Sequence, residues 1–534
     1  MIKKIIYFFF FNSFFEKKIK NAYEILEKNK KIELVYKIKE KLKNLRYYEN
    51  QTENSFKNYD LDIFLALNQF IYSRFINTSF FTSKLIFALA YGENFYFPIP
   101  KKYLDIINLS VKVSFFKSKL LFILCLVVLA IYQFFLIIIN ILFFFKPKVH
   151  FENKIFLNSI PNLHSNNESS YKNLDFYKWA IKKFKIDNNL IFFHCNKLID
   201  NKNIKLTHFE YKTNYVQNPI IPFFKLRYIG IFFKSILKTF KLFFKIIIFK
   251  KVELLLLIKD FFYFYYLESL PKNQFYNFCL FNNSDMVFRP LWTYVNEKNN
   301  KGSVIMYFYS TNMMPLLQEI NKNNYYEIYG YCLHSWSNYL TWNKNQKNWL
   351  EKEIKKNVSF IEESTIPFSG KHLSLEKKNK TLTIFDVPPK RTGIYYLLHN
   401  PYNIYTLEYC EKFLNDIINS IPENYYSYTD VIIKLKKDYD NIHPDYRRLI
   451  NKFTDKKKIQ LIKDISPESV IEISDATISV PFTSPAITSF YKKKETIYYD
   501  PSGQLSKDNC LEKQISLISS KESLESWVLN ILNK

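Results

Sequence analysis

The chain has 534 residues, which is too long for one ordinary hydrophobic core and predicts two or three domains. Hydrophobic residues make up 48% of it and aromatic residues 19%, which excludes a wholly disordered chain. The net charge of +27 favours anionic partners, namely nucleic acid, an acidic membrane surface or phosphorylated substrates. Zinc-finger and RNA-recognition signatures are absent from the sequence, so nucleic acid ranks last among these partners.

The six cysteines are scattered and form no CxxC pair. This spacing favours neither a disulfide framework nor a zinc site and is typical of a reducing cytoplasm. Lys, Asn and Ile recur throughout, as in proteins encoded by AT-rich genes. Lysines on solvated surfaces therefore explain the charge as well as any single anionic partner does.

The N-terminal region, residues 1–118, begins with the basic and apolar stretch MIKKIIYFFFFNSFF. This stretch resembles the start of a signal peptide, but it lacks a small-residue cleavage site. Its apolar part is also too short to span a bilayer. We expect a buried or interfacial helix here, at the start of a helical region.

Residues 119–146 contain the most apolar segment of the chain. Positions 120–145 are 26 residues without a charge, and lysines flank them on both sides. About 20 apolar residues suffice to cross a bilayer, so this segment predicts a transmembrane or membrane-embedded helix. A helix buried in the core of a large domain is the alternative. Because both flanks are basic, the orientation stays open.

Residues 147–270 begin with an Asn- and Lys-rich stretch, which we expect to be a variable soluble insertion. A basic amphipathic segment follows at 223–251, where four lysines recur at spacings of four, three and four: Lys234, Lys238, Lys241 and Lys245. On a helix this spacing places them in one stripe on an apolar cylinder. Such a helix suits an anionic membrane surface, and it suits the surface of a protein core equally well.

From about residue 271 the pattern changes to strands that alternate with helices. A first α/β domain is expected at 271–376, with strands in 302–312 and 358–368 and a helix at 341–356 between them. The charged stretch KKNK, at 377–380, marks the boundary to the next domain.

The last domain, residues 377–534, alternates more regularly. Helices separate its predicted strands, which cover 381–387, 430–437, 458–462, 476–480 and 495–500. Strands joined by helices at this spacing imply a parallel sheet with helices on both faces. The predicted fold class is therefore α/β, with two Rossmann-like domains behind a helical, membrane-associated N-terminal region.

Ligands bind beyond the carboxyl ends of the strands in an open parallel sheet. After the strand that ends at Val480, the loop PFTSP opens a helix. Thr483 or Ser484 can cap this helix, and Pro485 suits its first turn. Free amides at a helix start, beside hydroxyl groups, can hold a diphosphate. An ordinary capped turn uses the same residue types.

Two other strand ends carry groups that fit a phosphate. Lys434 and Lys436 project from one face of their strand and can neutralise phosphate charge. The first strand of the domain leads into a polar turn formed by Arg391, Thr392 and Gly393. The GxGxxG, GxxxxGK[ST], GxSxG and HExxH motifs are absent from the sequence, which disfavours hydride transfer, P-loop chemistry, and serine and zinc hydrolysis.

The segment SDATISVPFTSPA (474–486), followed by IYYDPSG (497–503), resembles bacterial polysaccharide biosynthesis proteins named for a Pro-Phe-Thr-Ser (PFTS) motif. Weaker matches occur in the expected order at 288–295, 307–312, 336–346 and 431–437. In this resemblance six residues have motif or structural roles: Pro481, Phe482, Pro485, Asp500, Pro501 and Gly503.

The resemblance implies two Rossmann-type domains of the GT-B kind and a glycosyltransferase-like activity in O-antigen, capsule or related glycan assembly. The C-terminal domain would hold a nucleotide-sugar donor, with Thr483 and Ser484 at its phosphates. Lys434 or Lys436 would offset the charge of the leaving group. The donor is a substrate and no separate cofactor is implied. Because either lysine would take the role that a metal ion plays in other transferases, the resemblance is consistent with a metal-independent reaction.

An inverting reaction needs a general base, and Asp285, Glu362 and Glu363 in the preceding domain are candidates. The membrane-like segments fit a lipid-linked or glycan acceptor, contact with membrane lipids and a place at the cytoplasmic face of the bacterial inner membrane. Two alternatives remain. One is a transferase that moves a polyol phosphate from a CDP-activated donor, and the other is a non-catalytic, membrane-bound assembly protein.

Overall fold

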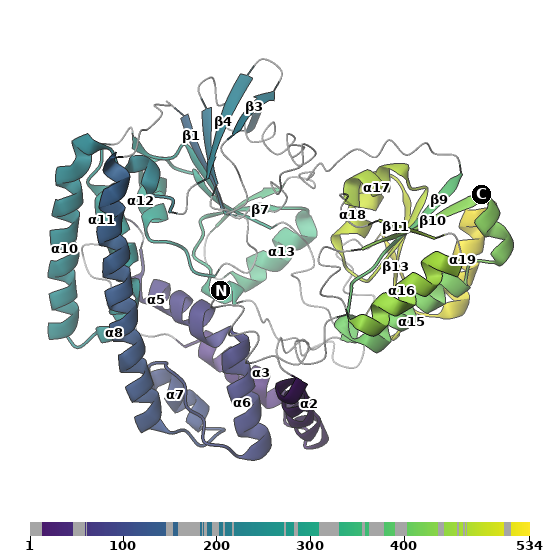
Figure 1. The fold of residues 1–534 in the computed structure, drawn as a ribbon, viewed down its shortest axis with the longest axis horizontal. Helices are drawn as coiled ribbons and strands as arrows, with labels where there is room; N and C mark the ends of the chain where they lie inside the picture. Colours follow the sequence, from purple (N-terminus) through teal and green to yellow (C-terminus); the bar gives the residue numbers. More distant parts are fainter. Residues whose placement is uncertain are drawn as a thin grey trace.

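The structure is a computed structural model in which two α/β domains lie side by side (Figure 1). A layer of long helices covers the outer side of the N-terminal domain. The residues that the structure describes are 13–45, 59, 61–145, 153–158, 182–183, 185, 190–194, 202–206, 209–215, 218–271, 274–281, 287–308, 330–354, 358–362, 379–389, 403–435, 443–456, 459–462, 465, 467–506 and 514–534.

The N-terminal region is helical. Its helices are α2 (Ser13–Lys28), α3 (Ile32–Lys43), α5 (Ile63–Ile71), α6 (Ser79–Tyr91) and α7 (Lys101–Asn108). Asp62 caps α5, because its side chain accepts hydrogen bonds from the amides of Phe64 and Leu65. The stretch at residues 1–12, where an interfacial helix is expected, lies outside the described residues.

Helix α8 (Phe115–Ile139) contains most of the apolar segment and continues into the 3-10 turn Asn140–Phe145. Among the described residues, Phe115–Phe144 is the segment long and apolar enough to cross a membrane, and an 18-residue window within it has a mean hydropathy of 3.0 and is 28% buried. The buried residues recur every three or four positions and form one stripe: Ser118, Phe122, Leu126, Ala130, Gln133 and Ile137. A helix in a domain core would be buried on all sides. Helix α8 is buried along one stripe only.

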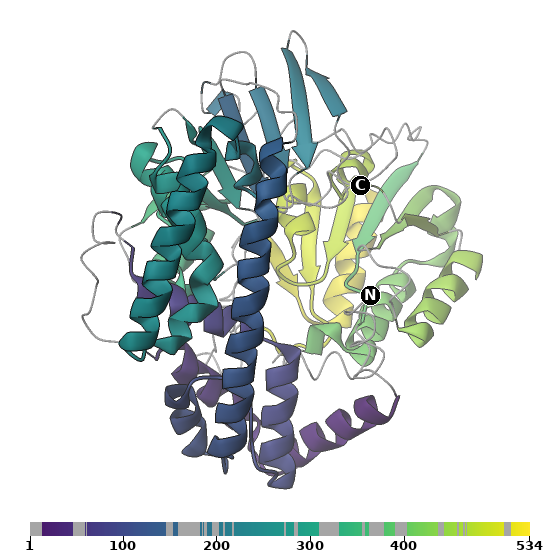
Figure 2. The same cartoon turned by 60° about the vertical axis from the view of Figure 1, so that its left-hand side comes forward.

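Helix α10 (Ile229–Ile248) lies beside α8 and runs antiparallel to it (Figure 2). Phe134 stacks on Phe240 with 5.1 Å between ring centroids, and Phe144 meets Phe232 near the start of α10. Of the predicted lysine stripe, Lys238 forms an ion pair with Glu268 on α11 (Ile258–Glu268). The other three lysines of the stripe are exposed.

The N-terminal sheet has eight strands in the order β3-β4-β2-β1-β5-β6-β7-β8. Every neighbouring pair is parallel except the hairpin β3–β4. Its strands are β1 (Asn153–Asn158), β2 (Leu190–His194), β3 (Lys202–Leu206), β4 (Phe209–Tyr215), β5 (Phe278–Phe281), β6 (Val304–Tyr307), β7 (Asn338–Thr341) and β8 (Ser359–Glu362). Helices α12 (Trp292–Asn299) and α13 (Lys344–Glu353) follow β5 and β7.

Four of these strands lie in residues 147–270, where we expected a soluble insertion. Strands β1, β3 and β4 contain lysines and asparagines, as in KNIKL of β3 and FEYKTNY of β4, which interrupt the apolar run expected of a buried strand. Strand β2 (LIFFH) is an apolar run that the sequence analysis missed. The sheet of the N-terminal domain thus begins at residue 153 and not after residue 271, and α10 and α11 form the crossover between β4 and β5.

The C-terminal sheet has six parallel strands in the order β11-β10-β9-β12-β13-β14. These are β9 (Lys380–Phe385), β10 (Thr429–Lys434), β11 (Gln460–Ile462), β12 (Ala476–Ser479), β13 (Glu495–Tyr499) and β14 (Ser516–Ile518). The intervening helices are α15 (Leu407–Asn419), α16 (Pro444–Lys456), α17 (Pro467–Ile473) and α18 (Ser484–Tyr491), and α19 (Lys521–Asn533) ends the chain. Each predicted strand is present, and the three-residue β14 was not predicted.

Numbered along the chain, the parallel strands of the C-terminal sheet have the Rossmann order 3-2-1-4-5-6, and those of the N-terminal sheet have the same order with β8 added as a seventh strand at the edge. This confirms the predicted α/β fold with a GT-B-like pair of Rossmann-type domains. One apolar cluster joins the outer helices to one face of the N-terminal sheet. A second contains residues of the opposite face, among them Leu280 and Trp342, together with the core of the C-terminal domain.

Candidate functional site

The PFTS turn lies where the strand order of the C-terminal sheet reverses. The strands run outward in sequence from β9 to β11 on one side and from β12 to β14 on the other. The connections that leave β9 and β12 therefore diverge, and this switch point is where open α/β sheets bind their ligands. Residues 480–483 follow β12 at this point, and the amide of Val480 donates to the carbonyl of Phe385 at the end of β9 (3.3 Å).

The first half of the motif sets the backbone of the turn. Phe482 has φ of 59°, in the left-handed region that non-glycine residues seldom adopt. A proline followed by a residue of positive φ is typical of a type II turn, and Pro481 supplies the proline. The Phe482 ring is buried and lies 5.4 Å from the ring of Tyr498 on β13. Burial of this ring offsets the cost of its backbone conformation.

The second half of the motif starts α18, the helix that faces the switch point. Thr483 occupies the N-cap position, and Pro485 lies in the first turn as expected. The Thr483 hydroxyl accepts no hydrogen bond from the first turn of the helix, however, and it donates to the carbonyl of Val480 (2.7 Å). Thr483 and Ser484 are only half-buried. The threonine side chain therefore leaves the first-turn amides of α18 to another acceptor.

Lys434 ends β10 at the same level of the sheet as the residue before the PFTS turn. It is aligned with Phe385 on β9, which is aligned in turn with Ser479 on β12. Two strand spacings, about 10 Å, separate the Lys434 and Ser479 backbones. The Lys434 ammonium is buried and donates to the carbonyl of Leu435 (2.6 Å). The charge of Lys434 therefore lies at the carboxyl edge of the sheet, as predicted, but the ammonium group uses one hydrogen bond on the loop that follows its own strand.

Ser479 is a polar residue that the sequence analysis missed. Its side chain is fully buried, and its hydroxyl has no hydrogen-bond partner among the described residues. In the sequence Ser479 is a small residue within a β-branched strand, and its type gives no sign of a site. The register of the sheet shows that it lies beside the turn. The other proposed phosphate-binding residues, Lys436, Arg391, Thr392 and Gly393, lie outside the described residues.

The Asp-Pro-Ser-Gly segment forms a turn after β13. The buried Asp500 carboxylate accepts from the Ser502 amide (3.0 Å), the Ser502 hydroxyl (2.6 Å) and the Leu505 amide (3.0 Å). Gly503 has φ of 66°, and the Pro501 carbonyl accepts from Lys412 on α15 (2.7 Å). These contacts satisfy Asp500 within its own turn and tie the turn to α15.

Asp386 follows β9 and also faces helices. Its carboxylate accepts from the Tyr446 hydroxyl of α16 (3.0 Å). Burial, and then the nearby Asp386 charge, raise the pKa of the Cys410 thiol. That thiol donates to the Val387 carbonyl (3.0 Å). These groups fasten α15 and α16 under the strand end.

Two of the weaker motif matches, 288–295 and 336–346, meet in the N-terminal domain at Arg289. Its buried guanidinium pairs with Glu297, donates to the Ser335 carbonyl (2.7 Å) and the Ser337 hydroxyl (3.1 Å), and lies 3.9 Å from the Tyr294 ring centroid. Arg289 therefore ties residues 288–295 (FRPLWTYV) to residues 336–339 (WSNY).

The described residues do not place any of the three candidate general bases at the PFTS turn. Asp285 and Glu363 lie outside the described residues, and Glu362 forms a half-exposed ion pair with Lys347 (3.0 Å). Among the described residues, no three His, Cys, Asp or Glu side chains gather as a metal site requires.

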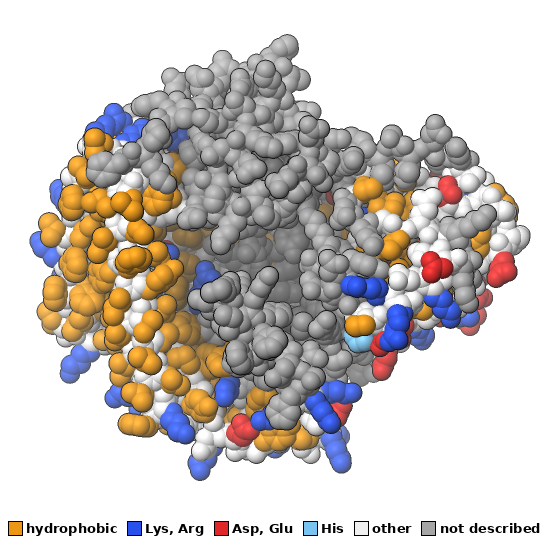
Figure 3. All heavy atoms as spheres, in the orientation of Figure 1, with side chains coloured by type: hydrophobic (Ala, Val, Ile, Leu, Met, Phe, Trp, Pro, Cys, Tyr) orange, Lys and Arg blue, Asp and Glu red, His pale blue; other side chains and the backbone are white. Residues whose placement is uncertain are grey.

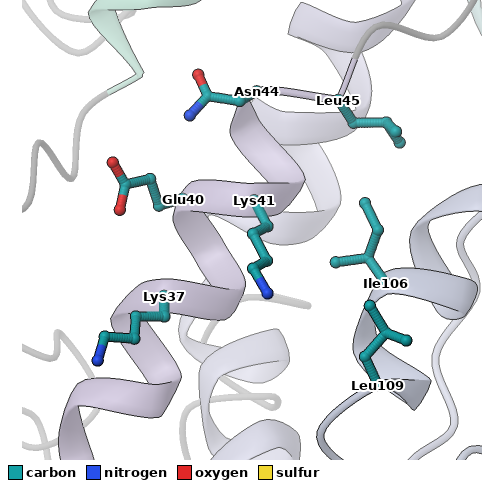
Figure 4. Close-up of a pocket in the computed structure, with 7 residues that line it drawn as sticks. All are labelled: Lys37, Glu40, Lys41, Asn44, Leu45, Ile106 and Leu109. Atoms are coloured by element: carbon teal, nitrogen blue, oxygen red, sulfur yellow. The ribbon is translucent and has the colours of Figure 1, made fainter.

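A cavity of about 740 Å³ opens elsewhere, between α3 and α7 (Figure 4). Its lining residues are Lys37, Glu40, Lys41, Asn44, Leu45, Ile106 and Leu109. All of them belong to these two helices or directly follow them, so this cavity involves neither sheet.

Residues 240–528 match the family model described as polysaccharide biosynthesis PFTS motif protein. The chain belongs to this family. The match covers more than half of the sequence and includes the PFTS turn, the Asp-Pro-Ser-Gly turn and both Arg289 segments.

No curated protein sequence matches this PFTS-motif protein. Solved structures similar to it include one described as trehalose-6-phosphate from E. coli bound with UDP-2-fluoro glucose (8% identity, TM-score 0.36, covering 71% of this chain and 91% of that one). Others are sucrose-phosphate synthase from Thermosynechococcus elongatus (10%, 0.38, 72% and 90%) and the wall teichoic acid polymerase TagF (11%, 0.37, 76% and 90%).

Proposed function

We propose that this PFTS-motif protein is a glycosyltransferase of bacterial surface polysaccharide assembly, such as O-antigen or capsule, that binds a nucleotide sugar at the PFTS turn. The supporting observation is the position of that turn, at the switch point of a Rossmann-type sheet and at the start of a helix whose first-turn amides Thr483 does not cap.

The chemistry of the site fits a donor diphosphate. The helix start presents backbone amides and the positive end of the helix dipole. Both stabilise the negative charge that develops on a departing nucleoside diphosphate. In the proposal Thr483 and Ser484 contact the phosphates, Lys434 contributes positive charge at the same edge, and Lys436, Arg391, Thr392 and Gly393 complete the site. The N-terminal domain supplies the acceptor side and the general base.

The proposal also includes an acceptor carried on a membrane lipid and a place at the cytoplasmic face of the inner membrane. The support is the exposed apolar surface of α8, since a soluble acceptor would not require it. This part is independent of the chemistry at the donor site.

The double variant Thr483→Ala/Ser484→Ala tests the donor site. Hydrogen bonds to charged phosphate groups contribute about 1.5–3 kcal/mol each, so we expect donor affinity to fall about tenfold or more. The matched control is Thr488→Ala/Ser489→Ala on the same helix, where both hydroxyls bond to backbone carbonyls within α18. Calorimetry with a panel of nucleotide sugars measures both variants. Equal affinities in the two variants would refute the phosphate role.

Product analysis separates the alternatives. Release of a nucleoside diphosphate with transfer of a sugar supports the glycosyltransferase. Release of CMP with transfer of phosphate to the acceptor would instead identify a polyol-phosphate transferase. Binding without release of any nucleotide would leave an assembly protein.

A further inference from the structure

Helices α8 and α10 together form one exposed apolar surface, here called the docking face. Its members include Leu124, Ile131 and Phe135 on α8 and Leu237, Phe244 and Ile248 on α10, all more than 40% exposed. On α8 they lie opposite the buried stripe, since they are offset from Leu126 by about half a turn. Figure 3 shows this face as a continuous apolar area over the two helices.

The two apolar stripes are contiguous. The stacked pair Phe134 and Phe240 lies between the helices, at the inner flank of each stripe. On α10 the exposed lysines Lys234, Lys241 and Lys245 follow the apolar stripe on the flank away from α8. The docking face is therefore an apolar surface with a basic border.

The two segments that form this face carry only positive charges. Residues 106–151 contain five Lys and no Asp or Glu, and residues 211–252 contain eight Lys, one Arg and no Asp or Glu. The acidic side chains visible in Figure 3 lie on the C-terminal domain and at the lower edge of the molecule. A monomeric soluble protein rarely exposes so large an apolar patch, and an anionic bilayer complements both its apolar centre and its basic border.

The attachment of α8 to the domain decides how a bilayer can meet it. The Ser118 hydroxyl accepts from the Phe97 amide (3.2 Å), and Asn140 at the far end bonds to the Tyr263 hydroxyl (3.2 Å). Between them, Gln133 donates to the Leu256 carbonyl (3.0 Å) and accepts from the Lys259 amide (2.9 Å). The folded domain thus lies along the whole helix, about 37 Å at 1.5 Å per residue.

A transmembrane α8 would also carry charge into the bilayer. Lys241 follows Phe240, which stacks on Phe134 in the second half of α8. A perpendicular α8 would place this lysine inside the hydrocarbon layer, where a charged side chain is costly. A helix that lies in the interface instead lets the border lysines extend to lipid headgroups.

We infer that α8 does not cross the membrane, and that α8 and α10 lie side by side in the surface of an anionic lipid bilayer. This inference gives a geometry to the membrane attachment in the proposed function. It holds whatever sugar is transferred.

Flotation of the full-length protein with phosphatidylcholine vesicles, with and without phosphatidylglycerol, tests the surface. We expect binding to require the anionic lipid and to weaken with salt. Lys241→Glu/Lys245→Glu should weaken binding about tenfold or more, since each basic residue near an anionic surface adds about 1 kcal/mol. Ile131→Asn/Leu237→Asn should weaken it comparably. The controls are Lys452→Glu on α16 and Leu529→Asn on α19, which should bind as the parent does.

Brominated lipids test the orientation through tryptophans introduced singly at Leu124, Ile131 and Ile138. In-plane binding predicts equal added quenching at all three positions. Deeper quenching at Ile131 than at the two ends would overturn the inference in favour of a spanning helix. A lipid-independent dimer that the Asn variants dissociate would overturn it in favour of a protein partner. Calorimetry with nucleotide sugars on the docking-face variants separates the membrane proposal from the donor-site proposal. A variant that loses vesicle binding but still binds the nucleotide sugar has a defect in the docking face alone.

Discussion

The two α/β domains share a strand order but differ in charge. Residues 379–534, which form the C-terminal domain, contain 21 Lys and Arg against 20 Asp and Glu. Residues 1–378 contain 55 against 29, so almost the whole net charge of +27 lies there. A bias of the genome toward lysine codons would act on both parts alike. We therefore attribute the difference in net charge to the helical layer with its basic border, which only the first domain has. The strand order that the two domains share does not explain it.

The comparison also separates two ways of using buried charge. The N-terminal domain buries an ion pair, Arg289 with Glu297, whose arginine joins two segments of the chain. The C-terminal domain instead satisfies Asp500 inside a single turn. We expect the first domain to depend more strongly on single polar contacts, and the predictions below test this, from the largest expected effect to the smallest.

Arg289→Met should have the largest effect. It leaves Glu297 without its buried partner, which typically costs about 3–5 kcal/mol of unfolding free energy. The control is Arg448→Met in the C-terminal domain, which removes an exposed pair with Asp445 and should cost less than about 1 kcal/mol. Urea unfolding followed by fluorescence measures both. Equal losses would show that the two domains do not differ in this respect.

Phe482→Ala should destabilise the C-terminal domain by about 3–5 kcal/mol, because it empties a buried site. Phe482→Gly should be no worse than the alanine variant, since glycine adopts φ near 59° without the cost of about 1–2 kcal/mol that alanine incurs. At Phe413, a buried residue within α15, glycine should instead be worse than alanine by about 1 kcal/mol. The same order at both positions would contradict the account of the PFTS turn.

Acid should weaken the N-terminal domain through His334. Its ring is buried between Tyr331 and Tyr339, neither ring nitrogen has a hydrogen-bond partner among the described residues, and burial lowers its pKa to about 3. The neutral form is the one that folds. The contribution of His334 to the free energy of unfolding is therefore fully present above the unfolded pKa of about 6.5. As the pH falls from there toward 3, the free energy of unfolding decreases by about 1.4 kcal/mol per pH unit.

The measurement is urea unfolding between pH 7 and pH 4. His334→Phe should remove this part of the acid loss, because phenylalanine fits an aromatic site and does not titrate. An unchanged acid dependence in the variant would assign the loss to other groups.

Helix caps should give the smallest effects, about 1 kcal/mol each. Asp62→Ala removes the cap of α5, and Thr406→Ala removes that of α15, where the hydroxyl accepts from the Tyr409 amide. If the domains unfold separately, each substitution shifts only the transition of its own domain. A shared transition in calorimetry would show instead that the apolar cluster common to both sheets couples them.

The sequence predicted the C-terminal domain more completely than the N-terminal one, for physical reasons. Strands such as β9 and β12 are buried along their length and appear in the sequence as short runs rich in β-branched residues between turns. Strand β3 pairs on one side only, at the edge of its sheet, so its lysines are tolerated and its pattern resembles a loop. The three residues of β14 are too few to show any period.

At the candidate site the motif and its turn were predictable, and the side-chain directions were not. The order of residues placed PFTS after a strand and before a helix. The hydrogen bond of Thr483 to Val480, the positive φ of Phe482 and the alignment of Lys434 with Ser479 depend on tertiary packing. For α8, hydropathy identified an apolar helix, but only the bonds of Gln133 show which stripe belongs to the protein.

The position of α10 in the chain has a consequence for how this protein can change. Because α10 and α11 connect β4 to β5, a deletion or a proteolytic cut there opens the sheet itself. An attachment helix at a chain end can be lost or exchanged without harm to the fold, and a helix inside a crossover cannot. Under the proposed membrane attachment, lipid affinity therefore changes only through substitutions on an exposed surface, in small steps that leave the architecture intact.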